Sequence, residues 1–365
     1  MSTVNPTRFS ILRHRPLNRF MKMTFSKLCC LAVLLVCGTA IAEDDQVYLK
    51  RGAAVAGTVE KATPTQVTVE TRGKSQGVNV NEIRLITFGD EPTELRQGRA
   101  RAVGGKYDLA LTDLQSVNAD ELERPLIKGD LQFYLAFCQA KIALSTGGDK
   151  AAATKSMLDF VRGASNSFHF FDAAYVLGDL AVAQGDYGGA VRYYSAIASK
   201  APWPEYKMRA SLSEARALVA QGAFDDAQAK FESVASQSSD APETKQQKLL
   251  AEIGRGRCLA ETDSPENGIQ VIETVIAEND ATDAELFGRA YNALGDCLQR
   301  AGKPKDALMA YLHVDVLFYA DPEIHAESLY HLSKLWETAK KPDRAATARN
   351  LLQQRYGGRV WAKKQ

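Results

Sequence analysis

Side chains that commonly carry out catalysis or bind metal ions are sparse in this sequence. Five histidines occur, and the nearest two, His325 and His331, fall on different faces of a helix, so they form neither a metal-binding pair nor a base with its orienting partner. The motifs G-x-S-x-G and H-E-x-x-H and the phosphate-binding P-loop are absent from the sequence. We therefore predict a protein that is not an enzyme and that needs no cofactor or metal.

The cysteines form no recognisable framework. Three of the six lie before residue 43, and Cys138, Cys258 and Cys297 are far apart without CxxC or CxxH spacing. This pattern fits neither a disulfide scaffold nor a zinc site. We expect the three to be small buried side chains.

A glycine-rich stretch, LGDLAVAQGDYGGAVRYYSAI at residues 177–197, has two possible interpretations. A phosphate-binding loop would need a strand before GDYGGAV and a Lys-Ser/Thr pair after it, and the sequence has neither. The other interpretation is a repeated unit, because LGDCLQRAGKPKDALMAYLHV, beginning at Leu294, has glycine, alanine and tyrosine at matching places. We expect Gly185 and Gly302 to end helices, and Gly178 and Gly295 to permit close helix packing.

Small residues recur at longer intervals than the about 34 residues of a standard tetratricopeptide repeat. They are Ala110, Ala152, Ala190, Ala227, Gly268, Ala307 and Ala345. Together with the two phrases above, they make residues 95–356 resemble tetratricopeptide repeats (TPR). The resemblance implies a mostly α fold, a right-handed α-solenoid of about six to seven TPR-like helical hairpins. Residues 357–365 form a basic tail, and we expect Trp361 to pack back on the last helix, the alternative being contact with a partner.

A different pattern occupies residues 43–90. Short β-branched runs with period two are separated by turn residues, as in a small antiparallel barrel. Gly57 falls inside one run and predicts a bulge or bend. The segment resembles small SH3-like or Sm-like β-barrels of exported bacterial repeat proteins, and because it is short we expect it to lean on the residues that follow.

The N-terminus has the order of an export signal. Residues 1–42 contain six basic and no acidic side chains, the apolar run LCCLAVLLVCGTAIA follows Lys27, and EDD comes next. Ala40 and Ala42 predict a signal peptide over residues 1–42, cleavage after Ala42, and a periplasmic or secreted protein without a stable transmembrane segment. The alternative is an uncleaved membrane anchor, although about 15 apolar residues are short for about 30 Å of hydrocarbon. Met1, Met21 and Met23 are all possible starts.

The balance of charge argues against nucleic acid as a partner. Lys and Arg number 45 against 44 Asp and Glu, and the N-terminal basic residues leave the rest of the chain mildly acidic. No basic patch or RNA-binding motif is present to contact phosphates. We expect the partners to be other proteins, bound as an extended peptide or a helix, with components of the cell envelope as further candidates.

The TPR resemblance also implies which side chains face the groove, since fixed positions of the first helix of each hairpin line it. Carried over, these are Tyr134, Phe137, Lys141, Asp172, Tyr175, Asp179, Arg209, Arg216, Arg257, Arg289, Asn292, Asp296, Gln299, Arg300, Tyr330 and Lys334. The arginines suggest a wall that binds an acidic or carboxylate-bearing protein segment. The alternative is a solvated face whose charges pair with neighbouring Asp and Glu.

Two functional hypotheses follow. The first is a non-catalytic scaffold or adaptor in the bacterial cell envelope, similar to the repeat proteins of outer-membrane assembly and the Tol-Pal system, a resemblance carried by LYHLSKLWETAKKPDRAATARNLLQQRY. The second makes the N-terminal β-barrel a binder of cell wall or another ligand, with the solenoid as its mount.

Overall fold

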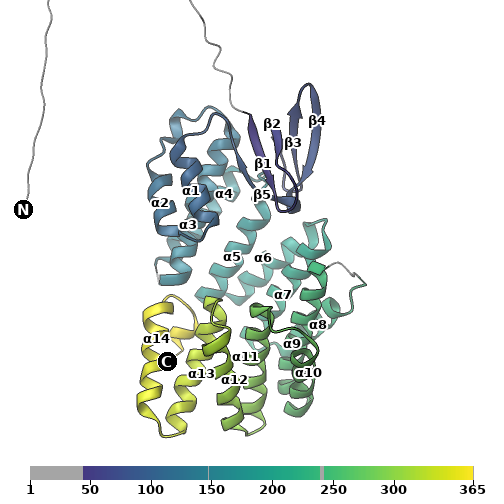
Figure 1. Ribbon diagram of the computed structural model, residues 1–365, viewed down its shortest axis with the longest axis vertical. Helices are drawn as coiled ribbons and strands as arrows, with labels where there is room; N and C mark the ends of the chain where they lie inside the picture. The colour runs from purple at the N-terminus through teal and green to yellow at the C-terminus, as the bar shows by residue number, and fades with distance from the viewer. Residues whose placement is uncertain (1–43, 147, 239–241, 365) are drawn as a thin grey trace, which may run out of the picture. The chain divides into compact units, whose positions relative to one another are not determined.

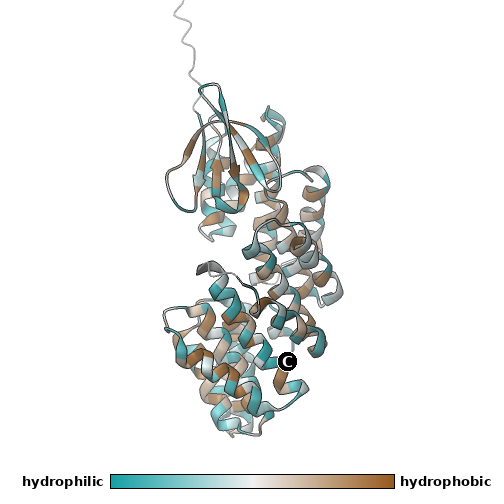
Figure 2. Ribbon diagram, turned by 90° about the vertical axis from the view of Figure 1, so that its right-hand side faces the viewer, coloured by the Kyte–Doolittle hydropathy of each residue, from teal (hydrophilic) through white to brown (hydrophobic). Residues whose placement is uncertain are grey.

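The computed structural model describes residues 44–146, 148–238 and 242–364 (Figure 1). These residues belong to one compact unit, Ala42–Gln365. The predicted signal peptide, residues 1–42, lies outside the described residues. Along the helices and strands of Figure 2, hydrophobic and hydrophilic residues alternate, as expected for elements that each bury one face.

A small antiparallel sheet comes first, in the order β4-β3-β2-β1-β5. The predicted small barrel is seen as these five strands, with β4 and β5 at the edges: β1 (Asp45–Leu49), β2 (Val55–Ala62), β3 (Gln66–Thr71), β4 (Lys74–Asn79) and β5 (Ile83–Thr87). A short 3-10 turn, Val80–Glu82, joins β4 to β5.

Strand β2 is shared by both halves of the sheet and changes its partner at Gly57, while the irregularity in its register lies between Val59 and Lys61, after the predicted position. Residues up to Gly57 pair with β1, and pairing with β3 begins at Thr58 opposite Glu70. Gly57 has φ of +155°, and a Cβ there would overlap the carbonyl oxygen of Glu70. Only glycine allows the strand to turn this close to its neighbour.

Helical hairpins fill the rest of the chain, which confirms the predicted α-solenoid. The described residues form seven pairs: α1 (Thr93–Val103) and α2 (Tyr107–Gln115), α3 (Pro125–Thr146) and α4 (Lys150–Gly163), α5 (Phe170–Gln184) and α6 (Tyr187–Lys200), α7 (Pro204–Gln221) and α8 (Phe224–Ala235), α9 (Pro242–Thr262) and α10 (Pro265–Glu278), α11 (Ala284–Arg300) and α12 (Pro304–Leu317), α13 (Pro322–Thr338) and α14 (Pro342–Tyr356). Helix α5 ends at Gly185 and α11 ends just before Gly302, both with positive φ, as expected from the sequence.

Small residues of the second helices lie where pairs pack together, with one shift of register. Ala190 and Ala307, like most of the predicted positions, are fully buried. Ala152 is exposed and Ala153 is buried in its place. The prediction was therefore wrong by one residue in α4, because several alanines occur in succession there and the sequence does not say which one faces α3.

The sheet has no separate core. Val47, Val67 and Ile86 belong to the same buried cluster as Leu131 of α3 and Leu180 of α5. This agrees with the expectation that the β segment leans on the helices. The last helix also contacts the second hairpin of the solenoid, since α14 packs against α3.

Candidate functional site

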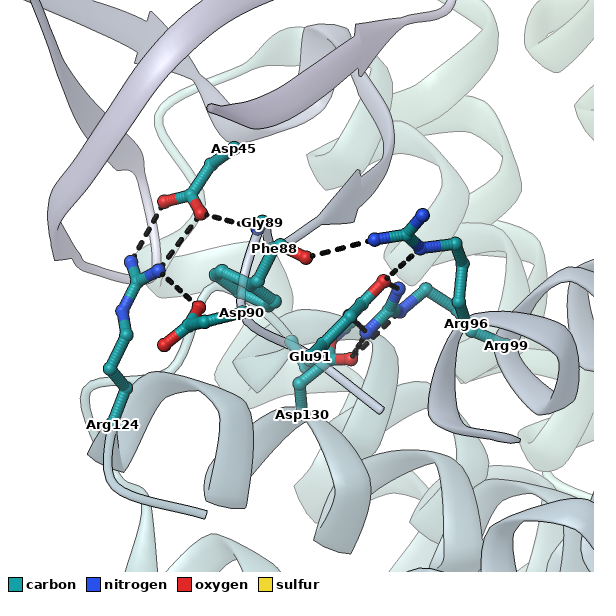
Figure 3. Close-up of polar contacts among 10 residues, drawn as sticks. Asp45, Phe88, Gly89, Asp90, Glu91, Arg96, Arg99, Arg124 and Asp130 are labelled. Atoms are coloured by element: carbon teal, nitrogen blue, oxygen red, sulfur yellow. Dashed lines mark hydrogen bonds and ion pairs between the residues drawn. The ribbon is translucent and has the colours of Figure 1, made fainter. Parts of the chain in front are cut away.

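Two sets of charged residues stand out in the structure: an ionic network under the sheet and the charged faces of the first helices of the hairpins. In the network, Arg124 donates two hydrogen bonds of 2.8 Å to Asp45 of β1 and one of 3.0 Å to Asp90 (Figure 3). The backbone N–H groups of Val59 and Gly89 also donate to Asp45. Burial alone raises the pKa of Asp45, but Arg124 and these N–H groups hold it below its ordinary value.

A second part of the network surrounds Arg99 of α1, which is 0% exposed. Its guanidinium lies 2.6 Å from both Glu91 and Asp130, and Nε2 of His169 lies 2.8 Å from the other Asp130 oxygen. Burial lowers the pKa of Arg99 and raises that of Asp130, but their mutual attraction outweighs burial in both. Each of these charges has a partner, so the network fixes the sheet on α1 and α3.

This network could hardly be predicted from the sequence. Asp90 and Glu91 lie in GDEPTEL, a turn-rich segment between the β segment and the first helix. Their partners Arg99, Arg124 and Asp130 are brought to them by tertiary packing. Two acidic residues in a boundary segment beside a predicted sheet are the only local sign.

Most arginines on the first helices of the C-terminal hairpins are paired, as the alternative interpretation expected. Arg257 contacts Asp296 at 2.5 Å and Glu327 at 3.0 Å. Arg289 lies 3.0 Å from Glu285, and Arg300 2.5 Å from Glu261. Most arginines of the predicted wall are therefore already paired with carboxylates of this same chain.

A repeated contact explains two of the predicted groove residues. Asp179 of α5 accepts a 2.8 Å hydrogen bond from the Tyr194 hydroxyl of α6 and faces Lys141 of α3 at 4.0 Å. The ring of Tyr194 lies against Gly178, where a Cβ would overlap it. One aspartate thus links two consecutive first helices and the second helix of its own pair.

The same arrangement recurs in the C-terminal half. Asp296 of α11 accepts a 2.5 Å hydrogen bond from Tyr311 of α12, whose ring lies against Gly295, and it pairs with Arg257 of α9. The recurrence of LGD before both tyrosines was visible in the sequence. The ion pair that this aspartate forms could not be predicted from the repeat, because its basic partner comes from the preceding hairpin.

Three further predicted residues are buried. Tyr134 is 5% exposed and packs among Phe133, Phe137 and His169. Asn292 is 1% exposed, and its amide donates to the Ile324 carbonyl oxygen at 2.8 Å and to Glu327. The hydroxyl of Tyr175 donates to the Tyr206 carbonyl oxygen at 3.0 Å. These side chains present little surface to a partner.

Arg209 and Arg216 of α7 differ from the other arginines. In the described part of the chain neither forms an ion pair: Arg209 is exposed and stacks 4.2 Å over the ring of Tyr175, and Nη2 of Arg216 is buried without a hydrogen-bond acceptor. Burial, and then the nearby charge of Arg289, lower the pKa of Arg216 to about 9. Lys334 of α13 is exposed above the ring of Tyr330.

The cysteines and histidines take part in packing. Cys138, Cys258 and Cys297 are free and buried as predicted, and burial raises the pKa of each to about 12. His325 is held between Asp315 and the Tyr356 hydroxyl, each at 2.8 Å.

Among the residues that the structure describes, no three His, Cys, Asp or Glu side chains are arranged to hold a metal ion. No helix in the described ranges has the length and apolar character needed to cross a bilayer.

Comparisons with known proteins agree with the fold. The tetratricopeptide repeat-like domain family matches residues 162–314. A tetratricopeptide repeat protein from Parabacteroides merdae is 15% identical, with 72% of this chain and 91% of that chain covered and a TM-score of 0.50. The Rap conjugation gene regulator of plasmid pLS20, in complex with the Phr* peptide, is 14% identical over 72% of this chain and 83% of that chain, with a TM-score of 0.51. No curated protein sequence matches the chain. At these identities the likeness shows a TPR-like fold.

Proposed function

We propose that this protein is a non-catalytic scaffold that binds carboxylate-bearing segments of other proteins through α7. The fold supports this function, because TPR-like hairpins present their first helices along a continuous wall suited to peptides and helices. A structure of similar fold, the Rap regulator, was determined with a peptide.

The observation that carries the proposal is the unsatisfied Nη2 of Arg216. Arg257, Arg289 and Arg300, on later first helices, each form an ion pair, whereas Nη2 of Arg216 has no hydrogen-bond acceptor within the described chain. A buried guanidinium nitrogen without an acceptor is costly, and a carboxylate from a partner can supply that acceptor. Arg209 on the same helix adds a second, exposed cation.

The proposal is tested with an array of short peptides in which each Glu-containing peptide has a Gln-containing twin. The native chain is expected to prefer the Glu member of each pair. Arg216→Gln should reduce that preference about tenfold or more, since one charge-assisted hydrogen bond contributes about 1.5 to 3 kcal/mol. Arg192→Gln, an exposed arginine on α6, is the matched control and should retain it. An unchanged preference in Arg216→Gln contradicts the proposal.

We further propose that the scaffold acts in the periplasm or outside the cell. The support is the sequence of residues 1–42, a basic segment, an apolar run and Ala40-Ile41-Ala42. N-terminal sequencing of the protein recovered from its own cells should then begin at Glu43. Recovery in the membrane fraction with residues 28–42 intact would support an uncleaved anchor instead.

A further inference from the structure

The last residues of the chain lie on the face of α13 that was predicted to line the groove. After Tyr356 the chain turns at two glycines, and the 3-10 helix η3 (Trp361–Lys363) packs mainly on α13. The ring centroid of Trp361 lies 5.5 Å from those of both Tyr330 and His331. Trp361 was expected on the last helix, α14. It packs on the preceding helix because the glycine turn reverses the chain.

This C-terminal segment, residues 357–364, is basic and the surface beneath it is acidic. Arg359 pairs with Glu323 of α13 at 3.0 Å, and Nζ of Lys364 lies 3.8 Å above the Trp361 ring. Lys364 is close enough to Glu327 and Asp296 for both to act on its pKa. We call Asp296, Glu323, Glu327, Tyr330 and His331 the acidic surface. Arg257 pairs with Asp296 and Glu327 there, so three carboxylates share one cation from the solenoid itself.

The charge of the segment complements that of the acidic surface, but several nitrogen atoms in the contact lack hydrogen-bond partners. Nε of Arg359 and Nε2 of His331 are buried without hydrogen-bond partners. Lys363 lies beside Lys150 at the start of α4, and Lys150 is 8% exposed with a pKa lowered by burial and then by Lys363. The like charges of Lys150 and Lys363 repel each other, which opposes docking of the tail.

The tail adds one small residue, Ala362, to the hydrophobic core, and Gln353 of α14 donates a 2.8 Å hydrogen bond to its carbonyl oxygen. Helix α14 already covers α13 through Ala345, Ala348 and Leu352, all buried. A terminal cap would cover the outward face of α14. The segment instead covers groove positions, among them Tyr330.

We propose that the acidic surface binds a basic, aromatic-containing peptide segment of a partner protein, and that residues 357–364 occupy this site as an internal competitor. The site is separate from Arg209 and Arg216 and opposite in charge, so this inference goes beyond the proposed function. While the tail is docked, the partner cannot bind. The apparent affinity for the partner is therefore the intrinsic affinity multiplied by the fraction of molecules in which the tail is undocked. The tail itself shows the chemistry that fits: a tryptophan flanked by arginine and lysine.

The test uses the full chain and a fluorescein-labelled synthetic peptide, GGRVWAKKQ, copied from residues 357–365. The native chain should bind it weakly. A chain with Trp361→Ala and Lys364→Glu should bind it about tenfold or more tightly, because its own tail no longer competes. Adding Glu323→Gln and Glu327→Gln to that chain should abolish the gain, and added salt should weaken binding.

The matched control removes a similar pair elsewhere on α13. Arg344 of α14 stacks 4.7 Å over Trp336, which lies on a different face of α13 from Tyr330. Trp336→Ala with Arg344→Glu should leave peptide binding as weak as in the native chain. Arg216→Gln, which tests the proposed function, should also leave it unchanged.

Two results would overturn the proposal. One is a Trp361→Ala, Lys364→Glu chain that keeps native circular dichroism and cooperative unfolding yet binds the peptide no better than the native chain. The other is a gain in binding that persists after the two glutamate substitutions.

Discussion

Single residues decide how much of the inner surface is available to a partner. Asp179 and Asp296, predicted as contacts, are instead bound to Tyr194 and Tyr311 within their own hairpins. Arg216 is the reverse case, a charge on the same kind of helix that receives no carboxylate within the described chain. Binding therefore depends on which charges the fold leaves uncompensated.

At this scale we predict that Arg216→Met stabilises the free protein. Because burial lowers its folded pKa to about 9, Arg216 is still charged at pH 7 in both states, and carrying that charge into the folded protein destabilises it. Replacing it with an apolar side chain should raise the free energy of unfolding by about 1 to 3 kcal/mol at pH 7, measured by urea denaturation.

The control for this prediction is Arg257→Met. That change leaves Asp296 and Glu327 without their partner and should lower the free energy of unfolding. A loss of stability in both variants would show that Arg216 is compensated after all.

Between elements, the ionic network holds the sheet on the helices. Asp45 of β1 and Asp130 of α3 both have lowered pKa values because arginines outweigh the effect of burial. A carboxyl group with a lowered folded pKa stabilises the protein above its ordinary pKa, near 3.8, and that stabilisation is lost as the pH falls through the folded value.

We therefore predict that the free energy of unfolding falls as the pH is lowered below about 4. Asp45→Asn should already lose about 3 kcal/mol at pH 6, since Arg124 keeps a buried charge without its main partner, and should depend less on pH below 4. Urea denaturation between pH 3 and 6 measures both effects. Asp159→Asn, at an exposed pair on α4, is the control and should change stability little. Equal pH dependence in the native and Asp45→Asn chains would contradict the assignment.

Local sequence patterns predicted the helices and strands. The predictions that were missed or wrong have physical causes. Gly57, Gly178 and Gly295 were identified because a required bend or close approach leaves a glycine in the sequence itself. The network around Arg99 was missed because its members come from separate segments and make no local pattern. The register of α4 was misplaced by one residue because successive alanines look alike until a neighbouring helix packs on one.

At the scale of the whole molecule, two charged surfaces coexist on the first helices of the solenoid. Arg209 and Arg216 lie on α7, and the acidic surface lies on α11 and α13 beneath the tail. The sequence indicated the arginines but not the acidic surface, because Asp296 joins Glu323 and Glu327 only when α11 packs beside α13. The hypothesis that the β segment binds cell wall stays a prediction, and its shared core with α3 and α5 means that it should be tested in the whole chain.

The return of α14 to α3 also bears on how the chain reaches this structure. Each hairpin joins neighbours in sequence and can form quickly and early, even during synthesis. The contact between α14 and α3 joins segments far apart in the chain, so we expect it to form after the local hairpins. Closure is then a late step of assembly, and the surfaces of α3 and α14 that meet stay exposed to solvent until it occurs.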